Sequence, residues 1–559
     1  MIYTRIRGRT FYVFIFFFSF FFFILLRIGY LQLFRNSFLK KLAKSQRYSL
    51  IHIEGERGKI YDCQGRILAT DINAFSIYAD PKLIKDKKKY SLLLSSALGV
   101  STSLIEKRLS RNRRFVWIKR KVSLEKKEKI EKLNLKGIGW VREKKRVYPQ
   151  GSLAAHILGG VNIDNHGIEG IELFYDTYLR GKKGMMQVRR DSSSILLSSP
   201  FVLYPQKGAD LVLTVDAQIQ YWVEKYLEDT VNYFNARKGA VVVINPYNGE
   251  ILALANFPSF DPNFLSKTSQ KNLRNYTISS TFEPGSVFKI VTLIACIAKR
   301  VDEKINTIFC ERGRFKIPGT ILHDYRPYSN LTFKGVFKRS SNIGVAKLAN
   351  LLGRKVLWEY IQKLGFGKKT GIDLPGEARG LVKPINSWSK TSSYIIPIGQ
   401  EIGVTLIQLV KAMSIIVNGG FDIQPHLAKK IISDNFVWEK KYEKKRVLSP
   451  WVVEKAKKIL VQVVEEGTGR RAKIKYVRVG GKTGTAQRFN IQLGRYAPYS
   501  YQASFVGFLE NEKLSLVIGV TIEEPKKSHL GGVVAAPLFK KIAEKILAYK
   551  VLQLELAKQ

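Results

Sequence analysis

The stretch from Thr281 to Ile290, TFEPGSVFKI, places Ser286 three residues before Lys289. If a helix starts here, the two side chains lie one turn apart on one face, where the amine can take the hydroxyl proton. The following residues, VFKIVTLIACIA, are almost wholly apolar and predict a buried helix. Burial favours the neutral amine that a base requires, and free N–H groups at the helix N-terminus can stabilise an oxyanion. Ser286 is therefore a candidate nucleophile, with Lys289 as its base.

Ser-x-x-Lys alone is weak evidence in a lysine-rich chain. The same spacing occurs at Ser37/Lys40, Ser123/Lys126 and Ser387/Lys390, and the ordinary interpretation is a polar turn before a helix. The sequence contains neither a G-x-S-x-G elbow nor an H-E-x-x-H zinc motif. The six histidines form no recognisable set. His323 is the one nearest the candidate region in sequence, and a structural role is expected for it.

Two further segments carry polar groups of the right kind. KRSSNIGVAKLA places Ser340 and Asn342 before apolar helical positions, where a plain serine N-cap is the ordinary interpretation. VRVGGKTGTAQ is a strand-like run ending at Lys482, Thr483 and Gly484. An edge strand that ends there could line a cleft, with a peptide added alongside it and the lysine and threonine facing a carboxylate.

Lys-Thr-Gly has two competing interpretations. GKT also ends a Walker phosphate loop, but Tyr476 stands where that motif requires glycine. The tripeptide occurs again at Lys369–Gly371, inside the Gly/Pro-rich LGFGKKTGIDLPGE, which predicts a turn. We choose the copy at Lys482–Gly484, because it closes a strand-like run and precedes a further strand pair.

The elements that position these residues begin near residue 210. DLVLTVDAQIQYWVEKYLEDT predicts a short strand, an Asp216 N-cap and a helix. GAVVVINPYNGEILALANF predicts a hairpin at the Asn248-Gly249 turn, and SYQASFVGFLENEKLSLVIGVTIEEP adds two late strands. We expect a sheet built from both ends of this domain, with a long helical part between them.

The N-terminus predicts a membrane anchor. Residues 10–26, TFYVFIFFFSFFFFILL, carry no charge, and as a helix they reach across most of a ~30 Å hydrocarbon layer. Arg5, Arg7 and Arg9 precede them without an acidic residue, which keeps residues 1–9 cytoplasmic. No small-x-small cleavage pattern follows. We expect an uncleaved, single-pass signal anchor in the inner membrane, with the catalytic part extracytoplasmic, or periplasmic.

We divide the chain into a leader (1–9), an anchor (10–33), a pedestal (34–209) and a main domain (210–559). The pedestal pattern is irregular, and its basic middle, residues 107–137, is interpreted as a solvated helical face.

The formal net charge of +48 would favour a polyanionic partner. Export argues against nucleic acid and leaves anionic lipid or wall polymer. Three scattered cysteines form neither a disulfide framework nor a metal motif.

S-x-x-K, S-x-N and K-T-G occur in this order, 54 residues from Ser286 to Ser340 and 142 more to Lys482. Together they resemble the penicillin-binding proteins and serine β-lactamases. RGKIYDCQGRILA, RVYPQGSLAAHILG and GIEGIELFYDTYLRGKKG resemble the class B pedestal region, and GIDLPGE, GVTLIQL and GGVVAAPLF are also similar to family signatures. The chain departs at Cys63-Gln64, commonly Arg-Asn, and at Glu401, often glycine, which affects pedestal contacts and cleft shape more than the reaction.

The resemblance implies a class B, monofunctional D,D-transpeptidase of peptidoglycan synthesis. The implied fold is α+β and α/β in several domains: the transmembrane helix, a dimerisation-like pedestal, and a transpeptidase domain. That last domain should combine an antiparallel sheet flanked by helices with an all-helical part. The FEPG lead-in and a chain that ends soon after the catalytic domain resemble the FtsI-like division branch more than the elongation branch.

The resemblance also implies the reaction. Ser286, deprotonated by Lys289, attacks the penultimate D-Ala carbonyl of a stem peptide and expels the terminal D-Ala. The backbone N–H groups of Ser286 and Thr485 form the oxyanion hole. An amine of a second stem peptide then takes the acyl group, and a β-lactam should acylate Ser286. No metal or organic cofactor is required.

The remaining site residues take binding and relay roles in this resemblance. Ser340 relays a proton, and Asn342 holds the peptide amide. Lys482 and Thr483 bind the donor carboxylate, and Gly484 lets the peptide lie alongside the strand. The implied partners are stem peptides, β-lactam antibiotics, the membrane, and an FtsW-like glycan polymerase with other division proteins.

Rival functions remain open. An elongation-type transpeptidase would share the whole pattern. A β-lactamase or β-lactam sensor keeps the fold and changes the fate of the acyl-enzyme, but the pedestal and the uncleaved anchor argue against it. An inert division scaffold, or a basic polyanion binder, is disfavoured because all three motifs are intact.

Overall fold

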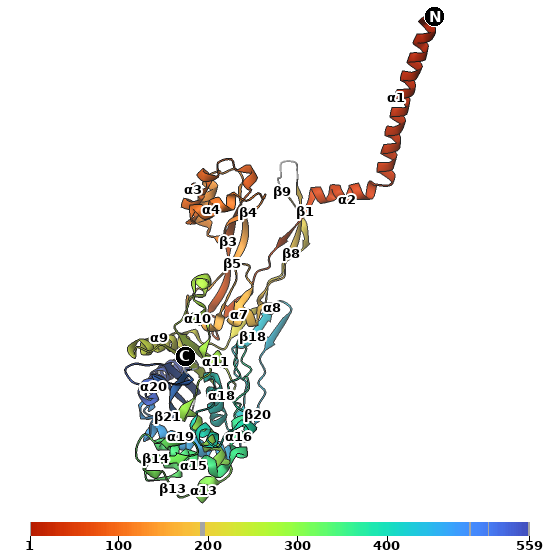
Figure 1. Cartoon of the computed structure of the whole chain (residues 1–559). Coiled ribbons are helices and arrows are strands. Elements are labelled where there is room, and N and C mark those ends of the chain that lie inside the picture. Colours follow the sequence, from red (N-terminus) through yellow and green to blue (C-terminus); the bar gives the residue numbers. More distant parts are fainter. Residues whose placement is uncertain (1, 191–195, 491–493, 513, 557–559) are drawn as a thin grey trace. The chain divides into compact units, whose positions relative to one another are not determined.

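The computed structural model of the 559-residue chain describes residues 2–190, 196–490, 494–512 and 514–556. The chain forms two compact units (Figure 1). The first comprises Met1–Glu56 and Gly181–Lys207, and the second comprises Arg57–Arg180 and Gly208–Gln559.

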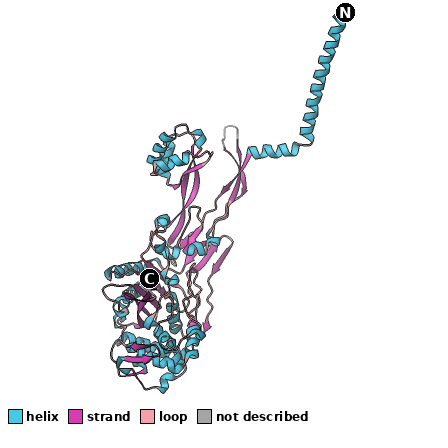
Figure 2. Ribbon diagram, in the orientation of Figure 1, coloured by secondary structure: helices cyan, strands magenta, loops and turns pink. Residues whose placement is uncertain are grey.

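The first unit consists of two helices and a small sheet (Figure 2). Its sheet is antiparallel, in the order β1-β8-β9. The elements are α1 (Ile2–Leu33), α2 (Asn36–Arg47), β1 (Tyr48–Ile53), β8 (Gly184–Arg190) and β9 (Leu196–Leu203). Within α1, Thr10–Leu33 has a mean hydropathy of 2.4 and is long and apolar enough to cross a membrane.

The pedestal part of the second unit is built on the long strand β3 (Ile67–Ala79), which pairs with β4 and β5. The basic stretch 107–137 was predicted as one helical face, and this is wrong. The pairing of β4 with β3 places a strand in the middle of it, between α4 and α5. The elements are β2 (Ile60–Tyr61), α3 (Lys87–Leu98), α4 (Thr102–Leu109), β4 (Val116–Val122), α5 (Leu124–Lys132) and β5 (Ile138–Val147).

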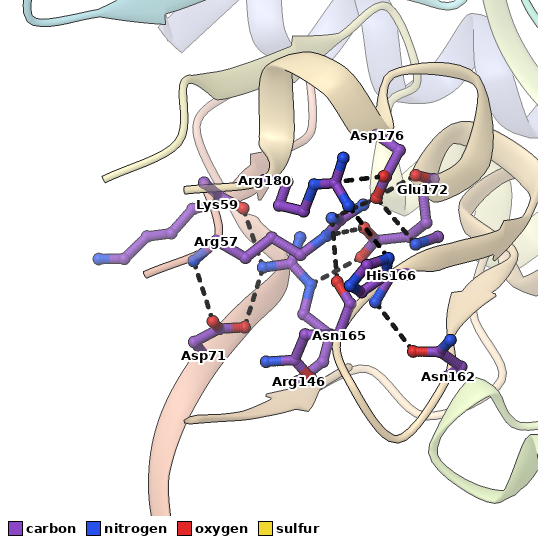
Figure 3. Close-up of polar contacts among 12 residues, drawn as sticks. Arg57, Lys59, Asp71, Arg146, Asn162, Asn165, His166, Glu172, Asp176 and Arg180 are labelled. Atoms are coloured by element: carbon purple, nitrogen blue, oxygen red, sulfur yellow. Dashed lines mark hydrogen bonds and ion pairs between the residues drawn. The ribbon is translucent and has the colours of Figure 1, made fainter. Parts of the chain in front are cut away.

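A buried ionic cluster fixes the base of the pedestal (Figure 3). The two oxygens of Glu172 accept from Nε of Arg57 and Nε of Arg146, each at 2.6 Å. Arg57 also pairs with Asp176 at 2.6 Å, and Arg146 with Asp71 at 3.3 Å. The cluster joins β3, β5 and the short helices α7 (Gly170–Phe174) and α8 (Asp176–Leu179).

A second set of strands continues from the pedestal into the following domain. β10 pairs in parallel with β2 and antiparallel with β18, and β19 forms the edge. These strands are β10 (Asp210–Leu213), β18 (Ala428–Ser433) and β19 (Phe436–Glu439). Both parts of the second unit therefore share one sheet.

The central sheet of the main domain is antiparallel, in the order β12-β11-β23-β22-β21. The predicted hairpin and the two late strands are confirmed, so both ends of the domain supply the sheet. The strands are β11 (Lys238–Ile244), β12 (Ile251–Phe257), β21 (Arg478–Asn490), β22 (Arg495–Glu510) and β23 (Ser515–Glu523).

Helices cover both faces of this sheet, because its strands alternate apolar side chains between two cores. Val241 and Val243 pack with α9 (Ala217–Tyr233) and α20 (Gly531–Leu556). Val242 packs in the larger core on the other face. Asp216 caps α9 as predicted, accepting from the backbone N–H groups of Gln218 and Ile219.

The larger core contains the helical part that carries two of the three motifs. Its elements are the 3-10 turn η3 (Gly285–Phe288), α12 (Lys289–Ala298), α14 (Phe333–Arg339), α15 (Asn342–Leu352), α16 (Arg354–Lys363), α18 (Leu406–Val417) and α19 (Pro450–Glu465). Cys63, Cys296 and Cys310 are all free thiols.

Candidate active site

Ser286 lies on the turn η3, which runs directly into the buried helix α12. Gly285 has φ of 52°, and a Cβ there would lie 2.9 Å from the carbonyl oxygen of Thr485. Glycine therefore lets the turn approach β21 closely. Ser286 is half-buried and Lys289 is fully buried. The predicted buried helix is confirmed.

Lys289 is surrounded by acceptors from the second motif. Its Nζ donates to the carbonyl oxygen of Ser340 at 2.6 Å and to Oδ1 of Asn342 at 2.8 Å. The hydroxyl of Ser340 lies 3.3 Å from the same nitrogen. The S-x-x-K and S-x-N motifs, far apart in sequence, thus meet at one amine.

Lys482 approaches Ser340 from the third motif. Its Nζ donates to Oγ of Ser340 at 2.9 Å and to the carbonyl oxygen of Thr483 at 3.3 Å. The Ser340 hydroxyl therefore lies between the amines of Lys289 and Lys482. Such a hydroxyl can accept a proton from one amine and donate one to the other.

The serine N-cap expected near Ser340 belongs to its neighbour. Ser341 caps α15, its Oγ accepting from the N–H of Gly344 at 2.9 Å. Ser340 ends α14 with φ of 59°, a left-handed conformation that is uncommon outside glycine. In this conformation the Ser340 hydroxyl does not cap the helix and contacts the amines of Lys289 and Lys482 instead.

Asp324 is a site residue that the sequence analysis missed. Its carboxylate accepts from Oγ of Ser341 at 2.6 Å and from the backbone N–H groups of Asn342 and Ile343. The carbonyl oxygen of its neighbour His323 accepts from Nδ2 of Asn342 at 2.8 Å. These contacts fix the S-x-N loop. The one available signal was the position of Asp324 beside His323, in ILHDY.

The K-T-G segment lies on β21, the edge strand of the central sheet. The strand was predicted to end there, but it continues to Asn490 because β22 pairs along its length. A Cβ at Gly484 would lie 2.7 Å from the carbonyl oxygen of Pro284, so glycine permits this contact with the Ser286 turn. The hydroxyl of Thr483 lies 2.9 Å from that of Thr468, and Oγ1 of Thr485 accepts from the N–H of Gly531 at 3.0 Å.

The other Lys-Thr-Gly copy has a different environment. The hydroxyl and backbone N–H of Thr370 both donate to Oε1 of Glu377 at 2.6 Å. Gly371 has φ of 83°, as a turn requires. Lys369–Gly371 therefore lies in a loop held by Glu377, outside helices and strands, within the segment that was predicted to turn.

Burial determines the electrostatics of the two lysines. It lowers the pKa of Lys289 well below its ordinary value, and the nearby charge of Lys482 lowers it further, while Asp324 acts in the opposite direction. Burial lowers the pKa of Lys482 to about 7. Within the described residues, no carboxylate forms an ion pair with either amine. A neutral Lys289 can therefore exist near neutral pH.

A cavity of about 800 Å³ adjoins the site along β21 and the segment before Ser286. Its wall includes Glu283, Glu401 and Ala486. Glu401 has φ of 55°, a left-handed backbone conformation that glycine adopts more easily than glutamate does. Its backbone N–H donates to Oε1 of Glu283 at 2.8 Å.

Family comparisons agree with this geometry. Residues 239–544, more than half of the chain, match the model of the penicillin-binding protein transpeptidase domain. Residues 52–213 match the penicillin-binding protein dimerisation domain. The chain belongs to the penicillin-binding protein transpeptidase family.

Relatives of this penicillin-binding protein span nearly its whole length. Stage V sporulation protein D of Bacillus subtilis is 34% identical over 95% of this chain and 84% of its own. Peptidoglycan D,D-transpeptidase FtsI of Escherichia coli is 31% identical over 92% of this chain and 87% of its own. Penicillin-binding protein 3 from Mycobacterium tuberculosis, solved with aztreonam, is 28% identical with a TM-score of 0.70, covering 89% of this chain and 97% of that one.

Proposed function

We propose that this protein is a peptidoglycan D,D-transpeptidase that acts through an acyl-enzyme on Ser286. The observation that carries the proposal is the buried pair Lys289 and Lys482 around the Ser340 hydroxyl, with Ser286 three residues before Lys289 on the turn that runs into α12. A neutral Lys289 takes the proton of Ser286, whose Oγ attacks the penultimate D-Ala carbonyl of a stem peptide. The backbone N–H groups of Ser286 and Thr485 stabilise the oxyanion.

The leaving group needs a proton when the tetrahedral intermediate collapses. Ser340 relays that proton from Lys289 to the departing D-Ala amine, and Asn342 holds the peptide amide. Lys482, Thr483 and Gly484 hold the donor carboxylate and backbone beside the open edge of β21. An amine of a second stem peptide then attacks the ester, restoring Ser286 and forming the cross-link.

The direct test uses both half-reactions. The full chain in detergent is incubated with a stem pentapeptide ending in D-Ala-D-Ala and with a second stem peptide carrying a free amine. Mass spectrometry should find released D-Ala and a cross-linked dimer with wild type, and neither with Ser286→Ala. D-Ala release without any dimer would mean that water is the acceptor, as in the hydrolytic rival.

We further propose that α1 anchors the protein in the inner membrane, with residues 1–9 cytoplasmic and the catalytic part extracytoplasmic. The arginines of the leader and the apolar run support this orientation. We propose the corresponding domain boundaries, with the pedestal at residues 34–209 and the transpeptidase domain at residues 210–559. Protease added outside spheroplasts should digest the catalytic part and leave a tag fused before residue 10 intact.

The FEPG lead-in supports a role in division beside an FtsW-like glycan polymerase. A fluorescently tagged copy should then gather at mid-cell. Uniform labelling along the side wall would support elongation instead.

A further inference from the structure

A second cavity, about 380 Å³ in volume, contains none of the catalytic residues in its wall. Its wall comes from α7, α8, β18, β19 and the loops around residues 371–373 and 424–426. We call it the aromatic pocket, after the five aromatic side chains that line it: Phe174, Tyr175, Tyr178, Phe436 and Trp438.

Four of these aromatic side chains are exposed well beyond what a core requires: Phe174 48%, Tyr178 49%, Phe436 45% and Trp438 38%. Single exposed apolar residues are ordinary, but a cluster marks a binding surface. Phe436 and Trp438 are two residues apart on the edge strand β19 and so lie on the same face of it. All four residues of β19 are exposed, so these aromatic rings do not serve the core.

The polar groups of the pocket are few and mostly fixed. Asp373, buried, accepts from the hydroxyl of Tyr175 at 2.9 Å and from two backbone N–H groups at 2.7 Å. His426 is 2% exposed and lines the pocket, yet its Nε2 has no hydrogen-bond partner among the described residues. A buried nitrogen without a partner is energetically unfavourable. A ligand with a hydroxyl or amide group would supply the missing partner.

A cationic cavity of about 440 Å³ continues from the aromatic pocket, sharing Gln424 and Lys440 with it. Nζ of Lys440 donates to Oε1 of Gln424 at 3.3 Å. The other lysines of its wall are Lys411, Lys441, Lys444 and Lys445. Its two acids are Asp422, paired with Lys411 at 2.8 Å, and Glu443. The net positive charge suits a ligand that carries carboxylates.

We propose that the aromatic pocket binds an N-acetylated amino sugar of a glycan strand, and that the adjoining lysines bind carboxylates of the peptide attached to it. The inference rests on the proposed function, which makes peptidoglycan the substrate. Aromatic rings stack on the apolar face of a sugar ring, while its hydroxyl and acetamido groups bond to His426 and Gln424. The volume falls within the ~300–1,000 Å³ of small-ligand sites.

Such a pocket would be a second binding site for the polymeric substrate, separate from the site around Ser286. A strand held by a sugar presents its stem peptides at a raised effective concentration without any new contact at Ser286. An apolar protein partner could pack on the same aromatic rings, but it would not form ion pairs with the lysines of the adjoining cavity. The combination of ring stacking, an unpartnered imidazole and neighbouring cations favours the glycan.

The test uses the full chain in lipid nanodiscs and peptide-free chitotetraose, a tetramer of N-acetylglucosamine. Saturation-transfer NMR and calorimetry should detect binding by wild type, weakened at least tenfold by Trp438→Ala and by Phe436→Ala. Trp451→Ala, a change of a similarly exposed tryptophan on α19, should bind as wild type does. Lys441→Ala/Lys444→Ala should weaken binding of a disaccharide pentapeptide and leave chitotetraose binding unchanged.

The assignment is overturned if wild type does not bind chitotetraose, or if Trp438→Ala and Trp451→Ala bind it equally. Penicillin labelling of the wild-type chain reports the proposed function separately. Labelling without glycan binding would remove the aromatic pocket's role and keep the transpeptidase. Glycan binding without labelling would keep the pocket's role and remove the transpeptidase.

Discussion

Ser340 links the two buried lysines that determine the electrostatics of the site. Its hydroxyl touches two buried amines, and two ammonium groups at this spacing in a poorly solvated place repel each other strongly. We therefore expect the two lysines to divide the proposed roles, with a neutral Lys289 as base and with Lys482 carrying the charge that a donor carboxylate would meet.

This division predicts a pH dependence for acylation. The rate constant for acylation by penicillin should rise with pH as Lys289 loses its proton, with a midpoint well below the ordinary lysine value of 10.5. Lys482→Met removes the neighbouring positive charge, so the pKa of Lys289 should rise and the midpoint should move to higher pH. Stopped-flow acylation with a fluorescent penicillin measures both profiles. A midpoint that stays in place, or moves to lower pH, would contradict the coupling.

At the scale of elements, the buried ionic cluster of the pedestal joins two strands and two short helices. Glu172 is fully buried between the guanidinium groups of Arg57 and Arg146. Glu172→Gln removes the carboxylate that Arg57 and Arg146 share and leaves them only Asp176 and Asp71 as ionic partners, so it should lower the free energy of unfolding by about 3–5 kcal/mol. Urea denaturation of the full chain in detergent measures it. Glu125→Gln, in the exposed pair with Lys129, is the control and should cause no measurable change.

Glu224 on α9 makes stability depend on pH. Burial raises its pKa to about 7, above the 4.5 of the unfolded chain, while its carboxylate accepts from Gln220 and the N–H of Ala154. The contribution of Glu224 to the free energy of unfolding is fully present below pH 4.5 and is lost as the pH rises through 7.

Glu224→Gln keeps the acceptor and cannot ionise. The variant should match wild type near pH 4.5 and exceed it by up to about 3 kcal/mol at pH 8.5. Melting temperatures at the two pH values test this. Parallel curves for the two proteins would show that Glu224 is not the titrating group.

Local patterns were sufficient for some elements and insufficient for others. The Asp216 cap and the hairpin at residues 238–257 follow from side chains near in sequence. The extension of β21 past Gly484, the strand within 107–137 and the role of Asp324 depend on pairing or contact with distant segments. Ser340 and Ser341 are the same residue type, and their different partners follow from different backbone conformations, which no periodicity reveals. The three motifs were found because each is short and local.

At the scale of the whole molecule, the proposed anchor and the proposed catalytic residues belong to separate units. The apolar part of α1 lies in the first unit, and every proposed catalytic residue lies in the second. A chain lacking residues 1–33 should leave the membrane fraction and still be labelled by penicillin, as fractionation and fluorography would show. Loss of labelling from a soluble, folded truncated chain would mean that the anchor takes part in the site.

The central claim is that Ser286 is the acylated nucleophile. Purified full chain is treated with labelled penicillin, digested and analysed by mass spectrometry, alongside Ser286→Ala, Lys289→Ala and the control Ser123→Ala, which alters another Ser-x-x-Lys pair. One label is expected on the peptide containing Ser286 in wild type and Ser123→Ala, none in Ser286→Ala, and labelling slowed about 10²–10⁴-fold in Lys289→Ala. An unlabelled wild-type chain, or equal labelling of Ser286→Ala, would contradict it.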